Sequence, residues 1–531
     1  MSSVRMRPCE TAIIQSTVVS TNCPAGAKPW VLLATILASS IVYIDGSVVN
    51  VALPAIETDL VTIAVVVQWL VNAYTLCLSA FLLVGGAAGD QFGRRRLFIL
   101  GTIIFAVASL WSGVAPTIAQ LISARAIQGV GAALLVPCCL ALIGANFDEA
   151  ERGKAIGTWA GSSAVATAIA PLLGGWMVDH FSWRWIFLIN PLIALPTVWI
   201  AYYRVPESRD PAARQGLDWL GTILLLLGLA GLVYGLIALP TSGWRDPIVL
   251  ASLTGGLALL VAFVLVEYRS RSPILPLSLF ASRTFSAVNV LTLFLYGAIG
   301  GVFFFLPFVL IQVHGFPATF AGAAFLPPTV LIAVLSRWAG GLVYRLGARV
   351  PLMIGPGIAA FGIALLGILV PNGSYWQFLV SLTILGFGMV VTVAPLTTTV
   401  IDAVPAHQTG VASGINNAVA SVADLFAVAI LGALAILILD QSLSQHLQSQ
   451  VLSDGAKHAI QAAHGQLVIE PTLTNLQGAD RAIVEPILRE SLAESIRAVL
   501  LIAAAFAAGA AIVATVIPQS TLHVDDSSRS V

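Results

Sequence analysis

Charged residues are scarce in this sequence. Lys and Arg number 25 and Asp and Glu another 25, together 9% of 531 residues, whereas 58% are hydrophobic. Soluble domains carry about 25% charged residues, so a water-soluble protein of this length is excluded. The chain is apolar nearly throughout, which also excludes a largely disordered protein.

An excess of one charge sign and a set of paired cysteines are also missing. The net charge is zero, which excludes a basic protein that binds nucleic acid. None of the 5 cysteines lies in the long polar segment 441–490, so we expect no disulfide framework there. His446, His458 and His464 share that segment without the spacing of metal ligands, and the chain has no phosphate-binding GxxxxGK[ST] loop. We therefore expect neither a metal nor another cofactor.

Long apolar runs make up the rest of the chain. A transmembrane helix needs about 20 mostly apolar residues, and this criterion predicts an all-α polytopic membrane protein with fourteen spans in the lipid bilayer. The spans lie near 30–52, 64–88, 97–115, 118–145, 154–178, 184–203, 218–239, 247–268, 285–311, 318–338, 350–370, 375–398, 409–438 and 493–517.

The distribution of Lys and Arg predicts the orientation, because cytoplasmic loops carry an excess of both residues. With a cytoplasmic N-terminus, the inside segments hold 18 of the 25, the outside holds 6, and Arg125 is left within a span. Both termini are therefore predicted to lie in the cytoplasm.

The chain also looks duplicated. The pattern Gly86-(x3)-Asp90-(x2)-Gly93-Arg94 after the second span has a degenerate echo at 340–349 after the tenth. Six spans precede a two-helix insert and six follow it, and paired halves of six helices are a known transporter plan. The predicted organisation is a cytoplasmic tail at 1–29, a first bundle at 30–203, a linker with two inserted helices at 204–284, a second bundle at 285–517 that includes the outer segment 441–490, and a cytoplasmic tail at 518–531.

Seven motifs then point to a family. They are 44–54 (IDGSVVNVALP), Gln68-Trp69 with Tyr74, 86–95 (GAAGDQFGRR), 125–131 (RAIQGVG), 170–175 (APLLGG), 183–191 (WRWIFLINP) and 410–417 (GVASGINN). In this order and at these spans, the chain resembles the fourteen-span drug:proton antiporter branch of the major facilitator superfamily. Gln91, Ala170, Ala420 and Asp424 depart from that branch's usual residues.

The resemblance implies the major facilitator fold and a proton-driven exporter of amphipathic small molecules, of the multidrug and antibiotic-resistance type, in a bacterial inner membrane. It also implies that Asn50, Gln68, Trp69, Tyr74, Asn416 and Asn417 line the substrate cavity. A dedicated exporter or importer of one metabolite is the alternative, and a membrane-embedded enzyme or receptor is a remote one, because the spans lack a histidine that could serve catalysis. A periplasmic accessory protein is not identified by the sequence.

Asp45 and Arg125 are charged residues within otherwise apolar spans. A charge at mid-membrane costs about 2.5–3.5 kcal/mol on insertion scales, so each needs a partner, a water-filled cavity or, for the acid, a proton. We expect Asp45 to carry the proton and Arg125 to couple it to the substrate. The alternatives are a structural Asp45 capped by Ser47 or Asn50, and an Arg125 held in a permanent ion pair or carbonyl clamp.

Asp424 lies about sixteen residues into the thirteenth span, and the resemblance does not supply it. It is either a second protonation site or an anchor for a cationic substrate. The alternative is a hydrogen-bonded packing residue next to a Ser or Thr.

Two glycine-containing motifs are candidate conformational switches. In the first, Gly86 and Gly93 allow close helix approach and a tight turn, and Asp90 with Arg94 and Arg95 can form a breakable cytoplasmic latch. The plain alternative is a topology anchor. In the second, Pro171 with Gly174 and Gly175 bends a helix and thins its surface, or is simply a kink.

Overall fold

The computed structural model describes residues 26–518, apart from 61, 210–216, 271–272, 406–407, 450–452, 469–472, 474–475 and 477. No strand occurs among these residues. Fourteen helices in this part of the chain are long and apolar enough to span a membrane, as the sequence predicts.

The first six long helices form one half of the molecule. They are α2 (Lys28–Asp59), α3 (Ala64–Phe92), α4 (Arg94–Val114), α5 (Ile118–Asn146), α6 (Glu149–His180) and α7 (Trp185–Arg204). Gly93 ends α3 with a φ of 113°, a backbone conformation that favours glycine, so α4 can begin at once in the opposite direction. Helix α5 packs on both α3 and α4.

A helical hairpin separates the halves. Its helices are α8 (Trp219–Ser242) and α9 (Pro247–Arg269), each capped by an aspartate side chain that accepts a backbone N–H: Asp218 from Gly221 and Asp246 from Ile248. Helix α8 packs on α3 from the first half and on α16 from the second. The inserted hairpin therefore lies along the line where the halves meet.

The second half is less regular than the first. It contains α10 (Arg283–Phe308) with the π-helix η2 (Val309–Val313), α11 (Ala318–Ala323), α12 (Leu326–Gly340), α13 (Leu342–Leu346), α14 (Arg349–Leu369), α15 (Tyr375–Asp402), α16 (Thr409–Ser449) and α19 (Gly478–Val513). The span predicted at 318–338 is split into α11 and α12. Pro327 and Pro328, in the first turn of α12, have no N–H with which to continue α11.

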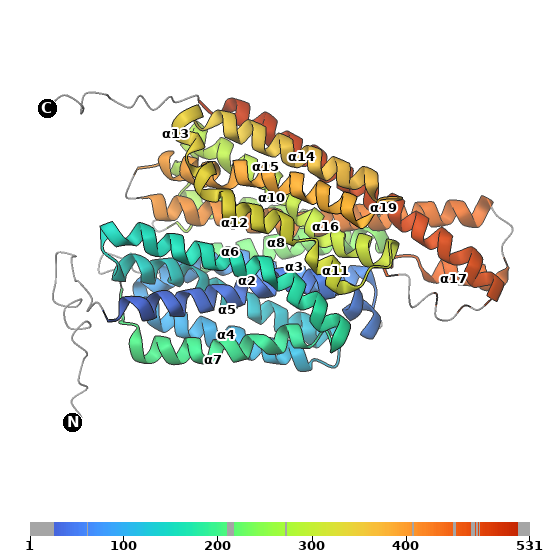
Figure 1. The fold of residues 1–531 in the computed structure, drawn as a ribbon, viewed down its shortest axis with the longest axis horizontal. Helices are drawn as coiled ribbons and strands as arrows, with labels where there is room; N and C mark the ends of the chain where they lie inside the picture. The colour runs from blue at the N-terminus through green and yellow to red at the C-terminus, as the bar shows by residue number, and fades with distance from the viewer. Residues whose placement is uncertain are drawn as a thin grey trace.

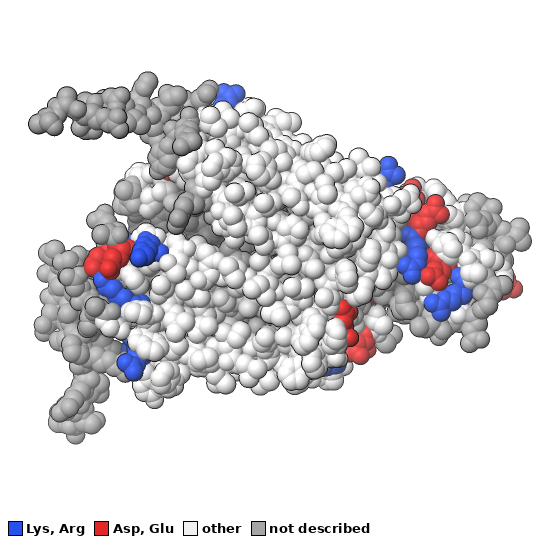
Figure 2. Space-filling view, in the orientation of Figure 1, with Lys and Arg blue, Asp and Glu red and all other residues white. Residues whose placement is uncertain are grey.

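The two halves lie side by side, with α2, α4, α5, α6 and α7 on one side and α12, α14, α15 and α19 on the other (Figure 1). Contacts between them run from α6 to α11 and α12, from α3 to α16, and from α2 to α10. In the space-filling view, the middle of the molecule is almost free of charged side chains, which gather toward its two ends (Figure 2). A belt of this kind suits a lipid surround.

The two ends differ in shape. At one end, α16 and α19 continue beyond the other helices, and α17 (Asp454–Ala462) lies with them (Figure 1, right); we call this the cap end. The Asp440 carboxylate holds the region together by accepting hydrogen bonds from the Gly465 N–H at 3.0 Å and pairing with His464 at 3.1 Å. The opposite end, where α2 begins and α4 starts at Arg94, we call the Arg94 end.

Candidate functional site

A cavity of about 1510 Å³ lies between the halves. Its lining runs from mid-bundle residues such as Asn50 and Asp424 to Asp90, Asp218 and Gln408 at the Arg94 end. At the cap end, the packing of α6 against α11 brings the halves together. In the described part of the chain, the cavity thus extends to the Arg94 end and not to the cap end.

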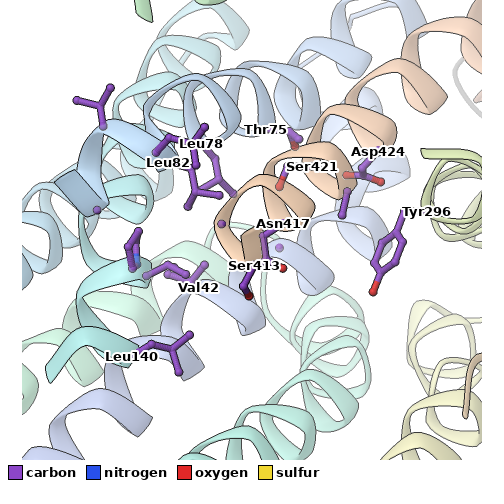
Figure 3. A pocket seen from close by; sticks show the side chains of 18 of the residues that line it. Val42, Thr75, Leu78, Leu82, Leu140, Tyr296, Ser413, Asn417, Ser421 and Asp424 are labelled. Atoms are coloured by element: carbon purple, nitrogen blue, oxygen red, sulfur yellow. The ribbon is translucent and has the colours of Figure 1, made fainter. Parts of the chain in front are cut away.

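One wall of the cavity carries a line of polar side chains on α16. Ser413, Asn417, Ser421 and Asp424 recur at intervals of three or four residues, so they share one helix face, and all four line the cavity. Figure 3 shows Leu78 and Leu82 of α3 and Val42 of α2 on one side of this stripe, and Asp424 beside Tyr296 of α10 at its end. The site therefore combines apolar walls with one polar stripe.

Asp424 is the acidic end of that stripe. Among the described residues, no hydrogen bond or ion pair to its carboxylate occurs, so the hydrogen-bonded packing role is not what the structure contains. The carboxylate lies against Gly300 of α10, where an added Cβ would collide with it. Within the described part of the chain, Asp424 is thus a carboxylate without a protein partner at the wall of a cavity.

Asp45 has the opposite environment. It is 0% exposed, and its carboxylate accepts from the Arg125 guanidinium through Oδ2 and, through Oδ1, from the amides of Gln128 at 2.7 Å and Asn190 at 3.1 Å. Ser47 donates instead to the carbonyls of its own helix at Tyr43 and Ile44. The expected alternative cap from Ser47 is therefore wrong, because that hydroxyl is already bonded.

Arg125 is held from several sides. Its Nη1 also donates to Gln128 Oε1 at 2.8 Å and its Nε to the Leu70 carbonyl at 3.3 Å. The guanidinium carbon lies 4.2 Å from the centre of the Tyr74 ring, a cation–π distance. The ion pair and the carbonyl contact that were expected for a purely structural Arg125 are both present. Arg125 and Tyr74 also line the cavity.

Charge and burial together define the state of this network. A buried ion pair is tolerated only when its remaining hydrogen-bonding groups are satisfied, and Asp45 uses both carboxylate oxygens. Asn190 links it onward to Ser109, whose hydroxyl donates to the Phe187 carbonyl at 2.9 Å. In this conformation both oxygens of the Asp45 carboxylate are occupied, and a proton could replace Arg125 only by breaking the pair.

The predicted cavity residues divide into two groups. Asn50, Tyr74 and Asn417 line the cavity. The structure does not place the other three there: Trp69 faces Tyr234 of α8 with ring centres 6.4 Å apart, and Asn416 donates to Asn289 at 3.2 Å and Thr292 at 2.8 Å. Gln68 is fully buried against Gly432 of α16, and neither amide atom has a hydrogen-bond partner among the described residues.

The loop after α3 forms its expected ion pair within one half. Arg94 Nε lies 2.8 Å from Asp90 Oδ1, while Arg95 donates to the Val205 carbonyl at 3.1 Å and its N–H to Glu207 at 3.0 Å. These bonds join α3 and α4 to the end of α7, not to the second half. The close helix approach expected at Gly86 occurs instead at Gly85, where an added Cβ would lie 2.9 Å from the Ala133 carbonyl carbon.

The Pro171 motif lies at the junction of the two halves. An added Cβ at Gly175 would lie 2.6 Å from the carbonyl carbon of Ala318, and one at Gly322 would lie 2.5 Å from that of Pro171. Gly174 faces the Val48 side chain of α2, within the first half. The small residues therefore let α6 and α11 touch backbone to backbone at the cap end.

Asp179, at the end of α6, fastens the same junction and was missed by the sequence analysis. Its carboxylate accepts the N–H groups of Ala318 at 3.0 Å and Thr319 at 2.7 Å, and the Thr319 hydroxyl at 2.5 Å. It thereby caps the first turn of α11, which belongs to the other half. No motif marks Asp179, and only its position four residues after Gly175 could have suggested a role.

Two bundles of six spans that enclose a cavity beside buried charges are the architecture of a membrane transporter. The family model described as Major Facilitator Superfamily matches residues 35–428. The chain belongs to this family, and it is a multi-pass membrane transporter rather than an enzyme.

Several characterised proteins resemble the chain. It is 35% identical over 480 residues to the puromycin resistance protein pur8 of Streptomyces alboniger, covering 88% of this chain and 93% of that protein. It is 32% identical over 430 residues to the multidrug resistance protein Stp of Mycobacterium tuberculosis (strain CDC 1551 / Oshkosh), covering 81% and 80%. The tetracenomycin C resistance and export protein of Streptomyces glaucescens is also 32% identical, over 409 residues, covering 77% and 76%.

Solved structures share the fold. A bacterial homologue of the human lysosomal transporter Spinster, inward-facing and occupied, superposes with a TM-score of 0.67 at 16% identity, covering 93% of this chain and 98% of that one. A D-xylose–proton symporter gives 0.57 at 16% identity, covering 84% and 96%. At this identity the likeness concerns the fold alone.

Proposed function

We propose that this protein exports amphipathic small molecules, antibiotics among them, across the cell membrane in exchange for protons. The observation that carries the proposal is the Asp424 carboxylate, which has no partner among the described residues and lies at the wall of a cavity between the two halves. The resistance and export proteins at 32–35% identity support the substrate class.

The cavity loads from the cytoplasm in this proposal. Lys28, Arg94–Arg96, Arg204 and Arg269 lie at or beside the Arg94 end, and a concentration of basic residues favours the cytoplasmic side. The cavity extends to the same end. The conformation is then inward-facing, with both chain termini in the cytoplasm.

The cavity lining suits amphipathic compounds with a positive charge. Its apolar part includes Val42, Leu78, Leu82 and the rings of Phe303 and Phe304, which bind hydrocarbon through exclusion of water. The hydroxyls and amide of the α16 stripe offer hydrogen bonds, and Asp424 offers a negative charge. A ligand ammonium group next to Asp424 would gain a charge-assisted hydrogen bond in a poorly hydrated place.

Exchange follows if one carboxylate binds the proton and the cargo in turn. A proton on Asp424 cancels the charge that holds the ligand cation, and the ligand cation makes the carboxylate's deprotonated form favourable. Asp45 acts in another way: a proton on it would release Arg125, which would then seek carbonyl or carboxylate partners elsewhere. The proton at Asp45 is therefore linked to a rearrangement of α2 and α5.

The test uses everted membrane vesicles with a fluorescent reporter of the pH gradient. A panel of lipophilic cations, neutral drugs and anions is added to wild type, Asp45→Asn and Asp424→Asn, with Asp246→Asn as the matched control. Asp246 caps the exposed start of α9 and does not line the cavity. Asparagine caps a helix equally well.

We expect cationic compounds to collapse the gradient in wild type and in Asp246→Asn. Asp45→Asn should abolish the response to every compound. Asp424→Asn should abolish the response to the cationic compounds in particular. If no compound collapses the gradient in correctly inserted wild type, the multidrug exchange is wrong and a dedicated single-substrate transporter replaces it. If Asp45→Asn responds like wild type, its role in proton coupling is wrong.

A further inference from the structure

Two carboxylates meet where the inserted hairpin closes at the Arg94 end. Asp218 precedes the first residue of α8, and Glu267 lies in the last turn of α9. Glu267 is only 2% exposed. Asp218 also lines the rim of the cavity, together with Leu217, Pro273 and Ile274.

Each carboxylate uses one oxygen to bind a backbone N–H. Asp218 Oδ1 accepts from Gly221 at 2.8 Å, and Glu267 Oε2 accepts from Leu275 at 2.9 Å. The first bond caps α8, and the second ties the end of α9 to the segment 273–276 at the cavity rim. The two side chains are therefore held at fixed positions by their neighbours.

The remaining oxygens face each other. Asp218 Oδ2 and Glu267 Oε1 are buried and have no hydrogen-bond partner in the described part of the chain. Both lie beside Gly221, where an added Cβ would be 2.9 Å from Oδ2 and 2.7 Å from Oε1. Two ionised carboxylates in this arrangement would each present an acceptor to an acceptor, and their charges would repel.

The other charged groups described at this end do not offset the repulsion between the two carboxylates. Among the described residues, Asp218 is the charged residue that interacts electrostatically with Glu267. On α3, Asp90 is paired with Arg94, and on α9 the neighbouring Arg269 is exposed. The segment Pro273-Ile274-Leu275-Pro276 has no titratable side chain, and the first acidic residue of α16 is Asp424.

We propose that Asp218 and Glu267 form a proton-binding site in which one proton is shared between Asp218 Oδ2 and Glu267 Oε1. The proton comes from water, its binding changes the charge of the pair from −2 to −1, and the O–H donates to the opposing carboxylate. The shared proton fastens the start of α8 to the end of α9 and to the rim segment 273–276. Carboxyl pairs that share one proton are a known solution for acids forced close together.

The site has its own consequence for stability. Because the shared proton joins two side chains that are apart in the unfolded chain, the contribution to stability is complete at low pH, where the proton is bound. It is lost as the pH rises through the range in which the folded pair gives up its proton. This holds whether or not the protein exchanges protons for drugs, since the hairpin pair is separate from Asp45 and Asp424.

The test compares purified wild type in detergent with Asp218→Asn and Glu267→Gln. Each amide donates the hydrogen bond at every pH, and asparagine still caps α8. We expect the melting temperature of wild type to fall as the pH rises. In each amide variant, the part of this fall that comes from the Asp218–Glu267 pair should be absent. Asp246→Asn, the aspartate cap at the other end of the hairpin, should keep the wild-type profile.

A second measurement does not depend on the variants' stability. Near neutral pH, infrared spectra of wild type should contain a C=O band from protonated carboxyl groups. The intensity of this band should drop by the contribution of one carboxyl group in either amide variant, and it should not drop in Asp246→Asn. Gly221→Ala, whose new methyl group would push the oxygens apart, should also reduce the band. An unchanged band and an unchanged melting profile in Asp218→Asn and Glu267→Gln would overturn the proposal.

Discussion

At the scale of single residues, two aspartates with the same chemistry have opposite surroundings. Asp45 is saturated by Arg125, Gln128 and Asn190, whereas Asp424 has no protein partner among the described residues. A group whose bonds are all made changes its partners only with a rearrangement, while an acceptor that lines a cavity can bind and release ligands directly. In the proposed exporter, Asp45 would therefore act through a conformational change and Asp424 through direct binding.

Gln128 gives a first prediction. Gln128→Leu removes the 2.7 Å bond to Asp45 and the 2.8 Å bond from Arg125, and leucine keeps the volume but no polar atom. Leaving buried charged groups short of partners costs about 1–3 kcal/mol, so we expect that loss in the free energy of unfolding, measured by denaturation in mixed micelles. Gln120→Leu, at an exposed position of the same helix, should change it little; equal effects would contradict the prediction.

The sequence identified the charged residues of this site but not the residues that bind them. A charge within an apolar span is visible in the sequence, so Asp45, Arg125 and Asp424 could be singled out. Their partners could not, because Gln128 and Asn190 lie 83 and 145 positions from Asp45 and are ordinary amides in a list of residues. Asn416 and Asn417 differ by one position, and a helix turns about 100° per residue, which is why one lines the cavity and the other bonds to Asn289 and Thr292.

At the scale of helices, the closed cap end depends on how near α6 and α11 approach. Gly175 and Gly322 face the partner backbone from opposite sides, and Asp179 caps α11. Helices with small residues at their contact approach closely and gain van der Waals contact. Any conformation that opens the cap end must break these contacts.

Gly175→Ala should shift the protein toward the conformation open at the cap end. The added methyl group would lie 2.6 Å from the Ala318 carbonyl carbon, so the helices must move apart. The shift is measured by spin-label distances between Phe181→Cys and Trp376→Cys, two exposed positions in different halves, in a background without the 5 native cysteines. Gly157→Ala, on the same helix with nothing within 4 Å of its Cβ, should leave the distances as in the parent.

Asp179→Ala tests the cap of α11 alone. It removes the acceptor for the N–H groups of Ala318 and Thr319, and loss of an N-cap costs about 1 kcal/mol. That corresponds to about a fivefold change in the ratio of conformers, in the same direction as Gly175→Ala and with the same spin labels. Asp179→Asn should retain most of the cap, and a shift as large as that of alanine would contradict this assignment.

The fold at this scale was predictable because its signals are local. Fourteen apolar runs become fourteen candidate spans, and six helices on each side of the hairpin follow from counting them. The division of the span at 318–338 into α11 and α12 was not predicted, although Pro327 and Pro328 were visible. Prolines are tolerated within membrane helices, so their presence does not tell whether a helix bends or breaks.

At the scale of the whole molecule, the proposed orientation makes the cavity accessible from the cytoplasm. In the cysteine-free background, Asn417→Cys on the cavity wall should react with a membrane-impermeant maleimide faster in everted vesicles than in right-side-out cells. Trp376→Cys, 75% exposed at the cap end, should show the reverse preference. If both residues react from the same side, the orientation or the single opening is wrong.

The position of the inserted hairpin has a further consequence for how lipophilic cargo enters. Helix α8 contacts α3 and α16, one helix from each half, so it screens that boundary from the bilayer. The opposite boundary, between α6 and α12, has no additional described helix over it. For the proposed exporter, compounds dissolved in the membrane would then approach the cavity from one flank alone, and uptake from the lipid would be asymmetric about the transport axis.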